Sequence, residues 1–377
     1  MKRFLIFVTC IIPATIAFYS CSEQEDQYDA IQAEEISLTK QTELDGGDDL
    51  VIGNINQVKI TENGDILLLD TQQKKIHLFG SSGNFVRSEL SEGDGPGEIR
   101  QAGRMNYSNG LVQIYDWSQR KLSQFILESD TQNGNLQLTF SKDLRPEIYP
   151  SEFHISPEGT NYVLYLPELM DDEDLIKIQA MSQDGELVGD PVLMFPNNES
   201  IEIKNEQGQR MVTFSSPHSR QILPVFHGNR LFLGRSEQVG FEVYNLKTGE
   251  QIDSVAYKRP DVELSSVEKR EFLDGMLERM GMEGIDSSSL ISQMPDLKGK
   301  IRSMFYDTDG VIWLNLISDE SSKTPEWLLL GEDGSLRGQV SEELAGLVMA
   351  VHSGKVYIRE ETEEGAQYLS VYEYKLQ

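Results

Sequence analysis

One strand pattern occurs twice in the first third of the chain, on either side of a glycine-rich stretch. The first copy spans residues 64–70 and 76–79, and the second spans residues 110–116 and 122–125. Between the copies stand residues 93–98, with the sequence GDGPGE. Repeats of roughly 40–50 residues that are built from short strands are typical of β-propellers. The pattern therefore predicts a propeller, with residues 93–98 as the boundary between its first two blades.

A polar-glycine turn followed by a β-rich run marks the start of each repeat. Six such turns occur along the chain, at Gly64, Gly110, Gly159, Gly228, Gly310 and Gly354. Second turns follow inside four of the repeats, at Gly83, Gly185, Gly249 and Gly334. Two turns in one repeat imply three strands joined by hairpins, with a fourth strand leading in. The chain is thus expected to form an all-β, six-bladed propeller over residues 33–377.

The last repeat is too short to complete a blade. After Gly354 there is room for strands near residues 356–359 and 368–374 and for no further strand. A closing strand must then come from the N-terminus, and residues 33–39 are the candidate for pairing with the last blade. Closure of this kind removes the exposed edges of a ring of sheets.

One helical insertion is predicted near residues 265–281, in the longest interval between repeats. Ser265 and Glu268 match a capping box, and Gly281 can end the helix. Apolar residues recur between them at helical spacing, namely Phe272, Leu273, Met276, Leu277 and Met280. We expect this face to pack on the propeller, and a lid over one mouth of the channel is the alternative.

The first 21 residues have the features of a secretory signal. Lys2 and Arg3 precede an apolar run, and the segment ends in Ser20 and Cys21. This ending resembles the lipobox of bacterial lipoproteins, although Phe18 stands where that family usually has leucine. The resemblance implies removal of residues 1–20, a lipid on Cys21 and an acidic tether over residues 21–32. An uncleaved transmembrane anchor is the alternative, but the apolar run is short for a span and contains a proline.

Charge and cysteine content exclude several classes of function. The chain has 33 Lys and Arg against 62 Asp and Glu, a net charge of −29, so no basic face is expected for nucleic acid. The two cysteines, Cys10 and Cys21, both lie in the first 21 residues, which leaves the folded body without thiolate metal sites or cysteine nucleophiles.

Candidate chemistry within the repeats is sparse. The histidines fall in different repeats without metal-ligand spacing, so no metal site is predicted, and no G-x-S-x-G motif is present. Asp70 and Asp116 each end a strand before a polar turn, where they are expected to accept hydrogen bonds from backbone N–H groups.

Three arginines form the candidate ligand site. Arg104, Arg220 and Arg302 each precede the glycine turn of a repeat, where the innermost strand of a blade should begin. Arginines that converge on the channel mouth would hold an anionic ligand such as a carboxylate or a sulfate. In the alternative interpretation, each arginine pairs with a neighbouring acid.

The repeats resemble NHL-type propellers and, together with the signal, the six-bladed propeller lipoproteins of Bacteroidetes. The resemblance rests on residues 93–98, on the strands ending at Asp70 and Asp116, and on residues 301–307, which lead to Trp313. It implies a binding platform without a cofactor, anchored by its lipid in the outer membrane and facing the periplasm or the cell exterior. The expected partner is a protein or an extracellular glycan or peptide. Alternatives are a calcium-dependent, lactonase-like hydrolase or lyase and an accessory subunit of a nutrient-uptake complex.

Overall fold

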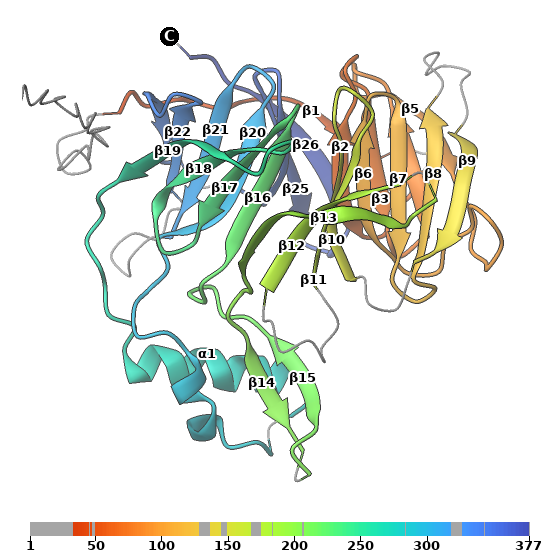
Figure 1. Cartoon of the computed structure of the whole chain (residues 1–377). Coiled ribbons are helices and arrows are strands. Elements are labelled where there is room, and N and C mark those ends of the chain that lie inside the picture. Colours follow the sequence, from red (N-terminus) through yellow and green to blue (C-terminus); the bar gives the residue numbers. More distant parts are fainter. Residues whose placement is uncertain are drawn as a thin grey trace, which may run out of the picture.

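The computed structural model describes residues 33–376, apart from residues 45, 47–49, 128–135, 145–148, 167–174, 183, 206, 283, 318–325 and 343. Within this part, the chain forms six four-stranded antiparallel sheets and a separate two-stranded sheet (Figure 1). The prediction of a six-bladed propeller is confirmed. The predicted signal, Cys21 and the tether lie outside the described residues, and no helix among the described residues is long and apolar enough to cross a membrane.

Each of the first five blades consists of four consecutive strands. Blade I contains β2 (Ile55–Ile60), β3 (Ile66–Asp70), β4 (Lys75–Phe79) and β5 (Phe85–Glu89). Blade II contains β6 (Ala102–Ser108), β7 (Leu111–Asp116), β8 (Lys121–Leu127) and β9 (Leu136–Asp143). Blade III contains β10 (Tyr149–Ile155), β11 (Asn161–Leu166), β12 (Leu175–Met181) and β13 (Leu187–Pro196). Blade IV contains β16 (Ile222–His227), β17 (Arg230–Arg235), β18 (Val239–Asn245) and β19 (Gln251–Tyr257). Blade V contains β20 (Ile301–Asp307), β21 (Val311–Leu316), β22 (Glu326–Gly331) and β23 (Leu336–Val340).

The second strand of blade I shows why these runs are apolar on both faces. Successive side chains of a strand point to opposite faces of the sheet. Ile66 and Leu68 accordingly pack in a core shared with blade VI, whereas Leu67 and Leu69 pack in a core shared with blade II. A blade between two neighbours must be apolar on both sides, which explains the uninterrupted sequence ILLL.

Blade VI is closed by an N-terminal strand. β24 (Leu347–His352), β25 (Lys355–Glu361) and β26 (Gln367–Glu373) are joined by β1 (Thr39–Leu44), which pairs antiparallel with β26. Closure from the N-terminus was predicted correctly, but the predicted residues were wrong.

The segment before β1 instead lies against blade V. The N–H of Ile36 donates to the carbonyl of Gln339 at 2.8 Å, and the N–H of Gln339 donates to the carbonyl of Glu34 at 2.9 Å. Ile36 is buried there because Gly338 has no side chain: a Cβ on Gly338 would lie 2.6 Å from the Ile36 side chain. Eight residues further on, Leu44 is buried beside Phe79 and Leu369. The N-terminal segment thus spans blades V and VI.

The first strand of each blade lies nearest the propeller centre. Consecutive first strands lie side by side, as β6 does with β2 and β10, and β20 with β16 and β24. In five blades a register shift near the start of this strand leaves one extra residue, at Asn56, Gly103, Ser151, Arg302 and Met349. β16 of blade IV pairs in regular register. Such bulges bend a strand and redirect its side chains, here at the mouth of the channel.

A satellite unit interrupts the ring on either side of blade IV. It consists of the hairpin β14 (Ile201–Lys204) and β15 (Arg210–Phe214), of α1 (Ser266–Arg279), and of the short helices η2 (Ser287–Ser289) and η3 (Ile291–Gln293). The hairpin precedes blade IV and the helices follow it. Figure 1 shows the unit projecting from the blades, below them in that view. We call the propeller face from which both segments emerge the insertion face.

The helix was predicted correctly, but its packing partner was not. Ser265 and Glu268 form the capping box, with the N–H of Ser265 donating to the Glu268 carboxylate at 2.8 Å. Leu273 and Leu277 of α1 pack against Ile201 and Ile203 of the hairpin rather than on a blade. The expected packing on the propeller is therefore wrong, because the hairpin, inserted elsewhere in the sequence, covers the apolar face of the helix.

Candidate functional site

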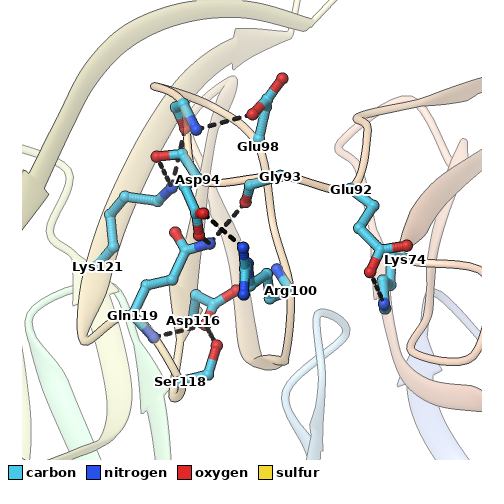
Figure 2. Close-up of polar contacts among 11 residues, drawn as sticks. Lys74, Glu92, Gly93, Asp94, Glu98, Arg100, Asp116, Ser118, Gln119 and Lys121 are labelled. Atoms are coloured by element: carbon cyan, nitrogen blue, oxygen red, sulfur yellow. Dashed lines mark hydrogen bonds and ion pairs between the residues drawn. The ribbon is translucent and has the colours of Figure 1, made fainter.

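The insertion face carries the loop of residues 91–99, which follows blade I. Figure 2 shows this loop with its neighbours. The N–H of Gly93 donates to the carbonyl of Ile99 at 3.2 Å, and the N–H of Gly95 donates to the Glu98 carboxylate at 2.7 Å. A Cβ on Gly93 would lie 2.0 Å from that carboxylate, so any larger residue would have to displace the Glu98 side chain. The loop is held in one conformation by its own contacts.

The loop is tied to blade II by one side chain of the turn after β7 and one at the start of β8. The side-chain amide of Gln119 donates to the carbonyl of Gly93 at 2.6 Å and to the Asp94 carboxylate at 3.1 Å. The ammonium group of buried Lys121 donates to the carbonyl of Gly95 at 2.9 Å. Residues 93–98 therefore form the junction between blades I and II, where the sequence placed the repeat boundary.

Two buried aspartates fasten the chain where it enters blades I and II. Asp116 accepts hydrogen bonds from the N–H groups of Arg100 at 2.5 Å, Gln101 at 2.8 Å and Gln119 at 3.0 Å. In the preceding blade, Asp70 accepts from the N–H groups of Gly53 at 2.6 Å, Asn54 at 3.1 Å, Gln72 at 2.9 Å and Gln73 at 2.9 Å. The predicted backbone-bonding role of both residues is confirmed.

These hydrogen bonds determine the ionisation of Asp70. Burial alone would raise the pKa of its carboxyl group, but the contact with His77 and the bonds from Gln73, Gly53 and Asn54 favour the carboxylate. The net effect lowers the pKa from 3.8 to about 2. The pKa of Asp116 is lowered as well, since bonds from Arg100, Gln101 and Gln119 outweigh the effect of burial.

Stability is therefore expected to fall in acid between pH 3.8 and about pH 2. A carboxyl group with a lowered folded-state pKa stabilises the fold above its unfolded-state pKa, and this contribution is lost as the pH falls through the folded value. For Asp70 the loss amounts to about 2 kcal/mol of the free energy of unfolding. Urea unfolding at a series of pH values measures it. The Asp70→Asn variant should show a shallower decline in this window, and an equal decline would exclude Asp70 as its source.

A pocket of about 350 Å³ opens beside the loop. Two ion pairs border it, Lys74 with Glu92 and Arg100 with Asp94 (Figure 2). The remaining lining residues are Gln101, Ser118 and Gln119. The pocket thus presents donors and acceptors together and carries no net charge.

The three sequence-predicted arginines lie on three different blades or their connections. Arg104 donates to the carbonyls of Ser151 at 2.7 Å and Gly103 at 3.1 Å. Arg302 is exposed at the bulge of β20 and forms no hydrogen bond or ion pair with the described residues. Arg220 lies just before β16 and pairs with Glu199 at 3.2 Å. Arg104 and Arg302 thus lie at the starts of first strands, and the convergence of all three on one ligand stays a prediction.

Sequence reasoning missed Trp117 and the pocket residues. The guanidinium group of Arg104 lies 5.9 Å from the centre of the Trp117 ring, which is 39% exposed. Trp117 directly follows Asp116, so an aromatic residue after a backbone-bonding aspartate was the available signal. Among the described residues, no cluster of three or more His, Cys, Asp or Glu is placed to hold a metal ion.

Comparison with known proteins identifies the fold family. A family model described as a 6-bladed β-propeller, DUF5128, matches residues 26–227. No curated protein matches the chain. A solved structure of a protein named as exported from Bacteroides fragilis is 14% identical, with a TM-score of 0.55, covering 90% of this chain and 95% of its own. A member of the DUF4221 family from Bacteroides vulgatus is 12% identical, with a TM-score of 0.57, covering 92% and 99%.

Some structural neighbours are enzymes. A streptogramin B lyase is 10% identical, with a TM-score of 0.44, covering 90% of this chain and 97% of its own. At such identities these likenesses describe the fold alone, since one propeller scaffold carries many unrelated functions.

Proposed function

Because the chain belongs to the DUF5128 family of six-bladed β-propellers, we propose that it acts as a binding platform whose ligand site is the insertion face. The ligand is an extracellular glycan or peptide that carries a carboxylate or sulfate group. In this proposal a lipid on Cys21 holds the protein in the outer membrane, facing the periplasm or the cell exterior. Residues 21–32 serve as the tether.

The positions of Arg104 and Arg302 carry this proposal. The chain has nearly twice as many acidic as basic residues. Even so, among the described residues Arg104 donates only to backbone carbonyls, and Arg302 has no hydrogen-bond or ion-pair partner. A guanidinium group binds carboxylates and sulfates with two parallel hydrogen bonds. Two such groups, at the starts of first strands and without an acidic partner in the part of the chain that the structure describes, are suited to an anionic ligand.

Replacing both arginines tests the proposal. We expect Arg104→Ala/Arg302→Ala to bind tetragalacturonate or a sulfated oligosaccharide at least tenfold more weakly, because a hydrogen bond to a charged group contributes about 1.5–3 kcal/mol. Calorimetric titration measures this loss of affinity. Repeating it at a second salt concentration shows whether the lost binding is electrostatic. Arg220→Ala is the matched control, since Glu199 already neutralises Arg220.

Two results would contradict the platform proposal. Unchanged affinity in the double variant would remove the arginines from the site, and an equal loss in Arg220→Ala would indicate a general charge effect. Elemental analysis of the purified protein supplies a separate check. Stoichiometric calcium, with hydrolase or lyase activity that disappears on chelation, would favour a propeller enzyme over a binding platform.

A further inference from the structure

The pocket beside the loop of residues 91–99 can bind a ligand without losing its ion pairs. Glu92 neutralises Lys74, and Asp94 neutralises Arg100. The pocket therefore has no excess charge that would attract an ion. Each of these groups retains further donor or acceptor positions. A zwitterionic amino acid would have to separate both pairs, whereas hydroxyl groups could bond to the remaining positions.

Gln119, one of the residues that line this pocket, has an acceptor without a partner in the described part of the chain. Its amide nitrogen is engaged by Gly93 and Asp94, but its amide oxygen is buried and has no partner among the described residues. A buried acceptor without a hydrogen bond costs about 1–3 kcal/mol. Because this oxygen is buried, a ligand donor could satisfy it only if the Gln119 side chain rotated toward the pocket.

Trp117 provides a fixed aromatic surface beside Gly103 and Arg104, one residue along the chain from the pocket. Its ring lies against the backbone of Gly103, where a Cβ would meet the indole nitrogen at 1.3 Å. Tyr115 contacts the ring edge-on at a centroid distance of 5.3 Å. The ring is therefore held in place although it is 39% exposed. The next residue along the chain, Ser118, lines the pocket.

We propose that this pocket and Trp117 form a carbohydrate subsite for a neutral hexose unit. Each sugar hydroxyl both donates and accepts a hydrogen bond, which matches the mixed lining, and the C–H face of a pyranose can stack on the indole ring. This inference rests on the proposed function and narrows its ligand. Because Arg104 contacts the Trp117 ring, the preferred ligand is an oligosaccharide with a neutral unit in the pocket and an acidic unit at Arg104.

The test uses neutral and acidic oligosaccharides with separate variants. The probes are a panel of neutral tetrasaccharides of glucose, mannose, galactose and N-acetylglucosamine, together with tetragalacturonate, titrated into the full folded domain. We expect at least one neutral tetrasaccharide to bind, and Trp117→Ala and Arg100→Gln each to weaken that binding at least tenfold. Arg220→Ala, whose arginine is already paired with Glu199, should bind the neutral sugar as the wild type does. The control is Ile126→Ala, which removes a similarly exposed apolar side chain from the same blade.

Failures of the two proposals are distinguishable. The carbohydrate subsite is overturned if no neutral tetrasaccharide binds, or if Trp117→Ala binds it as tightly as the wild type. This holds even if acidic ligands still bind. Loss of acidic binding alone in the arginine double variant supports the anionic platform independently. If Trp117→Ala proves unstable by thermal unfolding, Arg100→Gln decides the result, because Arg100 is 54% exposed and can be changed without altering the core.

Discussion

Replacing Asp70 with alanine is expected to lower the free energy of unfolding by about 4 kcal/mol, one of the largest effects of any single change in this chain. Asp70 is fully buried, and four backbone N–H groups donate to it. Alanine would leave these donors without partners in the interior and would remove the contact with His77 at 3.4 Å. Urea unfolding measured by circular dichroism gives the change.

Two further variants separate the carboxylate from the side-chain volume. Asp70→Asn keeps the shape and one acceptor oxygen, so its loss should be intermediate. Asp253→Ala removes an exposed aspartate from β19 and should change stability by no more than about 0.5 kcal/mol. If Asp70→Ala lost less than about 1 kcal/mol, the backbone near Gly53 and Gln73 would have to find other acceptors, and Asp70 would not fasten the blade.

Removing the closing strand should have the larger effect. A chain that begins at residue 50 lacks β1 and the segment that contacts blade V, and so loses the buried side chains of Ile36 and Leu44. Each large apolar side chain removed from a core costs about 2–5 kcal/mol, so the sum approaches the whole stability of an ordinary domain. The edge of β26 would also become available for pairing with other chains. We expect aggregation and loss of a cooperative thermal transition.

A chain of residues 33–377 is the control for this truncation and should unfold cooperatively. A synthetic peptide of residues 33–44, added to the truncated chain during refolding, should restore part of the transition by supplying the missing strand. The same peptide with Leu44→Asp should not restore it, because a carboxylate cannot enter the core beside Leu369. Equal melting temperatures for the truncated and control chains would show that blade VI is stable with three strands.

Periodicity and turn chemistry predicted the ring because both are local properties. The glycine turns, the buried second strands and the capping box at Ser265 each depend on residues close together in sequence. The closing strand could be inferred but not positioned. Residues 33–39 and 39–44 both contain β-forming residues, and the choice between them depends on distant partners, Gly338 for Ile36 and Leu369 for Leu44.

The candidate site was predictable only in part, for the same reason. The positions of Arg104 and Arg302 followed from the repeat, but whether an acidic side chain of the described residues pairs with them depends on which side chains the fold brings near them. The pocket joins Lys74, Asp94 and Gln119 from two blades, and no spacing in the sequence relates them. The hairpin of the satellite unit was missed because its two short strands lie inside a connection between blades.

The satellite unit also has a mechanical consequence. Along the sequence, its hairpin comes directly before blade IV and its helix directly after it. The hairpin and the helix share one apolar core of Ile201, Ile203, Leu273 and Leu277. Blade IV is therefore enclosed in a loop that is covalent along the chain and closed by this core. The two ends of blade IV are therefore tied to each other outside the ring as well as through the blade itself. The blade that lacks the repeating bulge is thus the one whose two ends are joined by a second core.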